Sequence, residues 1–196
     1  MNKLRLSYSL LTLWNNGRWE DAVKMYLHKD TFKTRQMREG LEMHKAWEKE
    51  IKEKNSLTIK SHTFKFKNPV CEFKVIAPYN KKWDMSGTFD VLSEDTIYEF
   101  KSGVMGSLEY SRGYQLPFYF LLAELSNISA KKGILIHYNQ YTKEYDTTLL
   151  WNSKRLIKKA KNFIDSLAPE IEDYFVKHNI SFDKQNVDKQ NMKGDE

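Results

Sequence analysis

The chain of 196 residues has a usual length for one domain, and its 40% hydrophobic and 30% charged residues are typical of a soluble globular protein. Its one cysteine, Cys71, excludes an intrachain disulfide and any zinc or iron–sulfur site that needs several thiolates from this chain. No apolar run approaches the ~20 residues that cross a bilayer, and no signal-peptide cleavage site follows the first residues. We therefore expect a cytoplasmic protein without a membrane partner, and the net charge of +6 favours a phosphate-rich partner.

Two helices are predicted in the first part of the chain. The first is expected over 7–27, with Ser7 or Ser9 as its N-cap and an interruption at the Asn-Asn-Gly sequence of 15–17. The second is expected over 31–54 and is capped by Thr31. Spacings of three and four along this second helix predict one face that turns towards the core, formed by Met37, Leu41, His44, Trp47 and Ile51.

Strands and further helices are predicted in the rest of the chain. The alternation over 57–66 and the run Val70–Ile76, ended by Pro78, indicate strands. Two hairpins are expected, over 83–101 with a turn at 93–95 and over 132–150, together with helices over 107–126, disturbed by Gly113 and Pro117, and 152–176. The order ααββββαββα predicts an α/β fold of the mixed α+β kind, in which helices flank a mixed sheet. We expect one domain over 1–183 and a disordered polar tail over 184–196.

The hairpin at 83–101 gathers charge on one face. Residues two apart in a strand share a face, so Glu99 and Lys101 point together. An even-length turn pairs Leu92 with Ile97 and then places Asp90 opposite Glu99, with Cβ atoms ~5 Å apart. Two carboxylates at that distance repel by roughly 3 kcal/mol at an effective dielectric near 20. A bound Mg²⁺ or Mn²⁺ reverses the sign of this interaction, while an ordinary cross-strand salt-bridge cluster is the alternative that spacing alone leaves open.

Several short motifs follow one another between about Ser7 and Leu125, and together they resemble the RecB-like branch of the PD-(D/E)XK nucleases. Each motif is weak alone, and the order and separation make the signal strong. A glutamate that the family often carries on a strand, Glu72, lies between them. The motifs are Ser7-Tyr8-Ser9 at a helix start, Gly40-x-x-x-His44, Gly87-Thr88-Phe89-Asp90, Glu99-Phe100-Lys101 followed by Ser102-Gly103, and Gln115-x-x-x-Tyr119.

The resemblance implies a restriction-endonuclease-like fold and a metal-dependent deoxyribonuclease that hydrolyses phosphodiester bonds. It implies that His44, Asp90, Glu99 and the Phe100 carbonyl hold Mg²⁺ or Mn²⁺, and that Lys101 positions or deprotonates the attacking water. Asp90, Glu99 and Lys101 would then be the catalytic residues. Two further roles follow from the resemblance: substrate binding for the pair Gln115 and Tyr119, and an accessory role for Glu72.

The resemblance also sets limits. We expect that the iron–sulfur cluster of many single-domain relatives is absent, and we expect no helicase domain such as RecB carries. Single-stranded DNA or DNA ends are the expected substrate, in recombination, repair or replication, either alone or with other replication or recombination proteins. Cleavage of RNA at the same site and a non-cleaving role in a nucleic-acid-binding assembly are the alternatives. Exonuclease or endonuclease action and the oligomeric state stay open.

Two residue roles have competing interpretations. His44 on an apolar face is either a metal ligand or a hydrogen-bonded core residue, and the spacing from Gly40 favours the ligand. Tyr119 is either part of the core or part of the substrate site, with Gln115 capping a backbone group disturbed by Pro117 in the first case. The other histidines, at 28, 62, 137 and 178, match no motif and are interpreted as surface or structural.

Overall fold

The computed structural model describes residues 3–27, 35–103 and 106–182, in which helices and strands are interleaved. The first elements are β1 (Leu4–Ser7), α1 (Tyr8–Asn15), α2 (Trp19–Tyr26) and α3 (Arg35–Lys54). A run of strands follows: β2 (Ser56–Ile59), β3 (His62–Lys65), β4 (Val70–Pro78), β5 (Trp83–Ser93) and β6 (Thr96–Gly103). The last elements are α4 (Ser107–Arg112), α5 (Gln115–Leu125), β7 (Lys132–Asn139), β8 (Tyr145–Trp151) and α6 (Lys154–Lys177). Within this described part, none of the helices has the length and apolar character of a membrane span.

A mixed sheet organises the fold, with β5 at its branching point. The strand order is β1-β5-β6-β7-β8, and β4 also pairs with β5. β4 pairs antiparallel along 84–92 and so occupies one edge of β5. β1 and β6 share the other edge, where β1 pairs parallel with 83–86 and β6 pairs antiparallel with 91–93. In the described structure, residues 87–90 therefore have no strand partner on that edge, and the sheet forks there.

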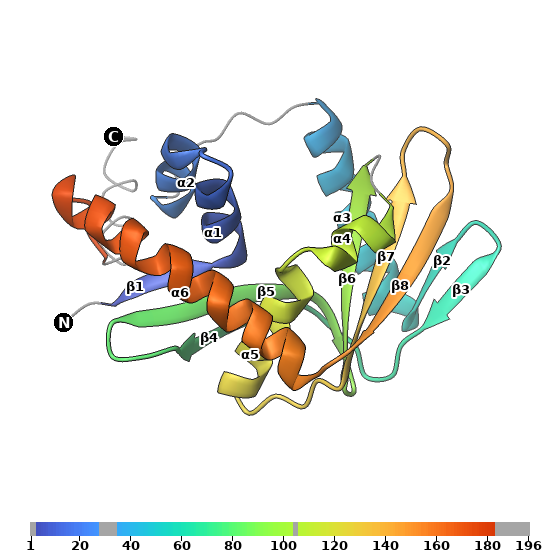
Figure 1. Ribbon diagram of the computed structural model, residues 1–196. Coiled ribbons are helices and arrows are strands. Elements are labelled where there is room, and N and C mark those ends of the chain that lie inside the picture. The colour runs from blue at the N-terminus through green and yellow to red at the C-terminus, as the bar shows by residue number, and fades with distance from the viewer. Residues whose placement is uncertain (1–2, 28–34, 104–105, 183–196) are drawn as a thin grey trace, which may run out of the picture.

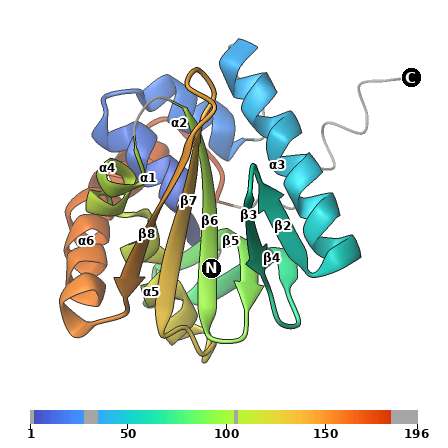
Figure 2. The same cartoon turned by 90° about the vertical axis from the view of Figure 1, so that its right-hand side faces the viewer.

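Helices cover both faces of the sheet, as expected from the sequence. Figure 2 shows α3 and the β2–β3 hairpin on one side of the sheet and α4, α5 and α6 on the other, and Figure 1 shows α6 running across the molecule towards α1 and α2. The larger core cluster joins α1, α2, α5 and α6 to one face. The smaller cluster joins α3 and the β2–β3 hairpin to the other face, through Trp47, Ile51, Leu57, Ile59, Phe66, Val91, Phe100 and Ile136.

The N-terminal region begins with a strand that was not predicted, β1, in which Leu4 and Leu6 are fully buried. The predicted helix then follows with its expected N-cap, because the Ser7 hydroxyl accepts a hydrogen bond of 3.2 Å from the Leu10 amide. The expected interruption is confirmed. α1 ends at Asn15, and Gly17 has a φ of 70°, which a glycine adopts without strain.

The buried face predicted for the second helix, α3, is correct in its C-terminal half and wrong in its N-terminal half. Trp47 and Ile51 are buried, but Met37 and Leu41 are 52% and 46% exposed. The row of residues that meets the sheet passes through Gly40, which is buried and so close to β6 that a Cβ on it would lie 2.5 Å from the Ser102 hydroxyl oxygen. The helix therefore approaches the sheet at a glycine that carries no hydropathy signal. The predicted cap, at position 31, lies outside the described residues.

Two other expectations change. Residues 57–66 form the hairpin β2–β3 instead of a single strand, and Lys60 at its turn has a φ of 54°. The predicted helix over 107–126 is two helices, because α4 ends at Arg112 and Gly113 is its C-cap. Pro117 does not disturb α5, since it lies in the first helical turn, where an amide hydrogen would have no helical acceptor.

Candidate active site

The β5–β6 hairpin has the predicted register. Leu92 pairs with Ile97, and Val91 pairs with Tyr98. Tyr98 and Phe100 face the cluster beneath α3, while Ile97 belongs to the opposite core. The even-numbered side chains of β6 near the motif thus point to α3, and the expected common direction of Glu99 and Lys101 is confirmed by their contact.

Asp90 lies where the ladder ends. The pairing of β5 with β6 stops at Val91–Tyr98, and the Asp90 carboxylate accepts a hydrogen bond of 2.7 Å from the Phe100 amide. In a regular strand Phe89 and Val91 would share a face, but Phe89 belongs to the larger core and Val91 to the smaller one. β5 thus changes face at Asp90, where the sheet forks and the backbone is free to twist.

Glu99 is held by residues from two elements. Its carboxylate is 3% exposed and lies 2.7 Å from the Lys101 ammonium on the same strand. Gln115, at the start of α5, donates its side-chain amide to the same carboxylate oxygen and also to the Tyr119 hydroxyl, 3.1 Å away. Gln115 and Tyr119 are one helical turn apart, so one face of α5 presents both to β6. The two readings of Tyr119 are not exclusive, because its ring is buried while its hydroxyl reaches this site.

Burial and crowding perturb the charges of the site. Burial raises the pKa of the Asp90 carboxyl well above its ordinary value, and the neighbouring Glu99 raises this pKa further. Burial also raises the pKa of Glu99, against the opposing effect of Lys101 and Gln115. For Lys101, burial would lower the pKa, but the two carboxylates outweigh it and raise the pKa above its ordinary value. The ammonium is therefore charged at neutral pH.

His44 on α3 approaches β6 on the side of Phe100. Its ring stacks on Trp47 with ring centres 5.6 Å apart and meets the edge of Phe100 at 6.2 Å. Burial, followed by the charge of Lys101, lowers the pKa of His44 to about 4. The imidazole is therefore neutral at pH 7, which is the form that binds metals.

The predicted metal ligands differ in how many of their side-chain atoms already have hydrogen-bond partners. Five buried side-chain atoms lack a hydrogen-bond partner in the described structure, and two of them, His44 Nε2 and Glu99 Oε2, belong to predicted ligands. A buried polar atom without a partner is uncommon. Across the described ranges, no three His, Cys, Asp or Glu side chains are gathered as a ready metal centre. One Glu99 oxygen is engaged by Lys101 and Gln115, and one Asp90 oxygen by the Phe100 amide. The predicted set His44, Asp90 and Glu99 thus stays a prediction.

Two further motif residues lie nearby. Glu72 is exposed, has a φ of 51° and lies at the point where the β4–β5 ladder passes from Cys71–Val91 to Phe73–Phe89. Partial desolvation of its carboxyl and the neighbouring Glu48 raise its pKa. Gly87 faces α5, where an added Cβ would lie 2.9 Å from Leu122 and 3.1 Å from Tyr119. The glycine of this motif therefore lets α5 lie close to the fork.

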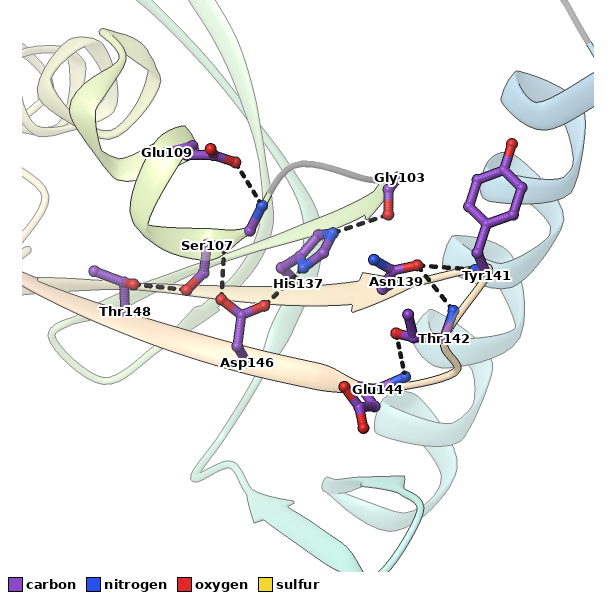
Figure 3. A network of polar contacts seen from close by, with 11 residues as sticks. Gly103, Ser107, Glu109, His137, Asn139, Tyr141, Thr142, Glu144, Asp146 and Thr148 are labelled. Carbon is purple, nitrogen blue, oxygen red and sulfur yellow. Dashed lines mark hydrogen bonds and ion pairs between the residues drawn. The ribbon is translucent and has the colours of Figure 1, made fainter.

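A polar network beside the site was not predicted. His137 on β7 is 2% exposed and bonds to Asp146 and to the Gly103 carbonyl at the end of β6 (Figure 3). The interpretation of His137 as surface or structural is thus resolved in favour of a buried structural residue. The sequence signal was weak, because this histidine follows the apolar run 134–136 with no motif around it.

Comparison with known proteins supports the fold. No family model and no curated protein matches the chain. Among solved structures, SSO0001 is 14% identical with a TM-score of 0.54, covering 84% of this chain and 77% of that one. The alkaline exonuclease LHK-Exo from Laribacter hongkongensis is 10% identical with a TM-score of 0.53, covering 89% and 92%. Its structure in complex with dAMP is 12% identical with a TM-score of 0.51, covering 89% and 93%. The mixed sheet of this chain, with helices on both faces, is thus similar in fold to the alkaline exonuclease structure.

Proposed function

We propose that this chain is a metal-dependent nuclease of the RecB-like PD-(D/E)XK type that hydrolyses phosphodiester bonds in DNA. One observation carries the proposal: a buried Glu99 is gripped by Lys101 and Gln115 beside Asp90, at the fork of the sheet. A cluster that served only stability would leave such carboxylates at the surface, since the desolvation cost is high. The likeness to an alkaline exonuclease supports the fold on which this chemistry rests.

Mg²⁺ or Mn²⁺ would be held by His44, Asp90, Glu99 and the Phe100 carbonyl. When bound, such an ion lowers the pKa of water and polarises the phosphate. His44 suits this set because its ring is neutral at pH 7, and Glu99 suits it because one oxygen is buried without a partner. Burial raises the pKa values of Asp90 and Glu99, and the charge of Glu99 raises that of Asp90 further, so a bound cation would favour the ionised form of both carboxyls.

Lys101 acts in this proposal as a fixed positive charge. Its raised pKa keeps the proton on Nζ, so it orients the attacking water and stabilises the negative charge that develops on the phosphate. This favours the positioning role over proton abstraction, the two roles that the motif left open. The protons released by water would then pass to solvent or to a carboxylate of the site.

Gln115 and Tyr119 fix the position of the Glu99 side chain in this proposal. Gln115 donates to both Glu99 and Tyr119, so it fixes the rotamer of the carboxylate. Burial raises the pKa of Tyr119 well above its ordinary value, and Glu99 adds to this, so the phenol stays neutral. In contact with DNA, this neutral hydroxyl and the amide would position the strand without adding charge.

DNA with single-stranded character or free ends is the proposed substrate. The net charge of +6 suits a polyphosphate partner, and LHK-Exo, an exonuclease of the same fold, has been crystallised with dAMP. Asp90, Glu99 and Lys101 are all present, which disfavours a non-cleaving assembly subunit.

The test is incubation with linear and circular single-stranded DNA and with RNA of the same sequence, in Mg²⁺, Mn²⁺ or EDTA. We expect cleavage of DNA in either metal and none in EDTA. Lys101→Ala should be inactive, while Lys158→Ala, which removes an exposed lysine of α6, should match the wild type. Undiminished cleavage in excess EDTA would overturn the metal mechanism, and faster cleavage of RNA would overturn the substrate.

A further inference from the structure

A buried histidine lies next to the catalytic strand. In the parallel register of β6 and β7, His137 pairs with Lys101, so the two side chains leave the sheet on the same face. Figure 3 shows the ring between two oxygen acceptors. Nδ1 lies 2.7 Å from an Asp146 carboxylate oxygen on β8, and Nε2 lies 3.1 Å from the Gly103 carbonyl oxygen.

Asp146 extends the network to α4. Its second oxygen accepts a hydrogen bond of 2.7 Å from the Ser107 amide at the first residue of α4. The Ser107 hydroxyl lies 2.6 Å from the Thr148 hydroxyl, and Glu109 accepts from the Gly106 amide at 2.9 Å. The network therefore forms hydrogen bonds to the last residue of β6, Gly103, and to the first residue of α4, Ser107.

The chemistry of the pair makes this grip strong. The ring contacts one oxygen with each nitrogen, so a single side chain links the Asp146 carboxylate on β8 to the Gly103 carbonyl on β6. A hydrogen bond to an ionised carboxylate is stronger than one between neutral groups. Burial would raise the pKa of Asp146, but hydrogen bonds from Ser107 and His137 outweigh it and lower the pKa. Loss of the ring would leave the Gly103 carbonyl without this donor and Asp146 with one partner fewer.

The position of the pair links two halves of the active site. β6 carries Glu99 and Lys101, whereas α4 leads through Gly113 into α5, which carries Gln115. The contact of Gln115 with Glu99 requires β6 and α5 to keep a fixed separation. We propose that His137 and Asp146 are a positioning pair that sets this separation, an inference that rests on the proposed nuclease function.

The experiment compares His137→Phe, His137→Gln and Asp146→Asn with the wild type. Thr142→Val is the matched control, because Thr142 makes a polar contact at the turn of the same hairpin, to the Glu144 amide, without joining β6 to α4. Two quantities are measured: kcat and KM on single-stranded DNA with Mn²⁺, and hydrogen exchange of individual amides in the metal-free proteins.

We expect kcat of His137→Phe to fall by about tenfold to a hundredfold, with KM almost unchanged, because misplaced groups lose transition-state contacts. His137→Gln, which keeps one donor, should recover part of the loss, and Asp146→Asn should fall in the same direction. Exchange should quicken at the Phe100 amide, which the histidine does not touch, as well as at Ser107. Thr142→Val should match the wild type in both measurements.

Two results would overturn the positioning role. One is wild-type kcat in a folded His137→Phe or Asp146→Asn protein. The other is a change in exchange confined to residues 103–107 with Phe100 unaffected. If the wild-type protein cleaves no nucleic acid, the proposed function fails, and exchange at Phe100 still decides whether the pair positions β6.

Discussion

Gly87→Ala is a small change that tests how the fork of the sheet supports the site. A Cβ at this position would lie 2.9 Å from Leu122 Cδ2 and 3.1 Å from Tyr119 Cε1. Favourable carbon contacts lie at about 3.5–4.0 Å, so the two α5 side chains must withdraw by roughly 0.5–1 Å. They have little room to do so, because Phe118, Leu121 and Leu122 are completely buried. Overpacking of this kind costs about 1–3 kcal/mol.

The same displacement should reach the active site through Tyr119. Its hydroxyl accepts from Gln115, which holds the Glu99 carboxylate, so a shifted ring changes the geometry of the catalytic strand. We expect the melting temperature to fall by roughly 2–4 °C for each kcal/mol lost. We also expect kcat of the folded variant to fall by about tenfold or more.

Gly133→Ala is the matched control. Its Cβ would lie 2.8 Å from Leu116 Cδ2 and 3.1 Å from Phe120 Cζ, so it overpacks the same helix at a similar distance without touching Tyr119. Thermal melts and steady-state cleavage of both variants decide the matter. Equal losses of kcat in the two variants would show that α5 moves as a body, and wild-type stability of Gly87→Ala would refute the packing argument itself.

Three further predictions concern charge. Asp90→Ala should lose both cleavage and the Mn²⁺ binding measured by calorimetric titration. Lys101→Ala should lose cleavage but keep most Mn²⁺ binding. Cleavage by Lys101→Ala at the wild-type rate would show that Lys101 is only a structural ion-pair partner. The pKa of His44 is lowered from 6.5 to about 4, so the unfolded chain protonates first as the pH falls and stability is lost between these values. In metal-free urea denaturation, the wild type should lose about 2 kcal/mol of unfolding free energy relative to His44→Phe between pH 7 and pH 5, and an unchanged difference between the two proteins would exclude this contribution. The logarithm of the DNA binding constant should fall steeply with the logarithm of the salt concentration. A binding constant that does not change with salt would argue against phosphate contacts.

The parts of the site that follow local rules could be predicted from the sequence. The register that pairs Leu92 with Ile97 follows from a two-residue turn and strand alternation. The contact of Glu99 with Lys101 follows from the same period of two, and the joint presentation of Gln115 and Tyr119 follows from one helical turn. Each depends only on residues close together in the chain.

The parts that depend on tertiary geometry could not be predicted in this way. Alternation assigns Phe89 and Val91 to one face, but the fork twists β5 between two cores. Apolar spacing assigns Met37 and Leu41 to the buried face of α3, but the close contact with β6 occurs at a glycine that hydropathy does not register. His137 acquires its role only from the pairing of β6 with β7 and from a carboxylate on β8, neither of which marks the sequence around it.

The N-terminal strand has a consequence for how the chain folds during synthesis. Leu4 of β1 pairs with Trp83, which is synthesised later, so at the usual 5–20 residues per second β1 waits for roughly 4–16 s. α2 waits longer, since Tyr26 packs on Phe175 of the last helix with ring centres 4.9 Å apart. Until α6 is synthesised, the apolar side chains of β1, α1 and α2 lack part of the core against which they pack. The fold should therefore close late and slowly, because its core joins early and late parts of the chain.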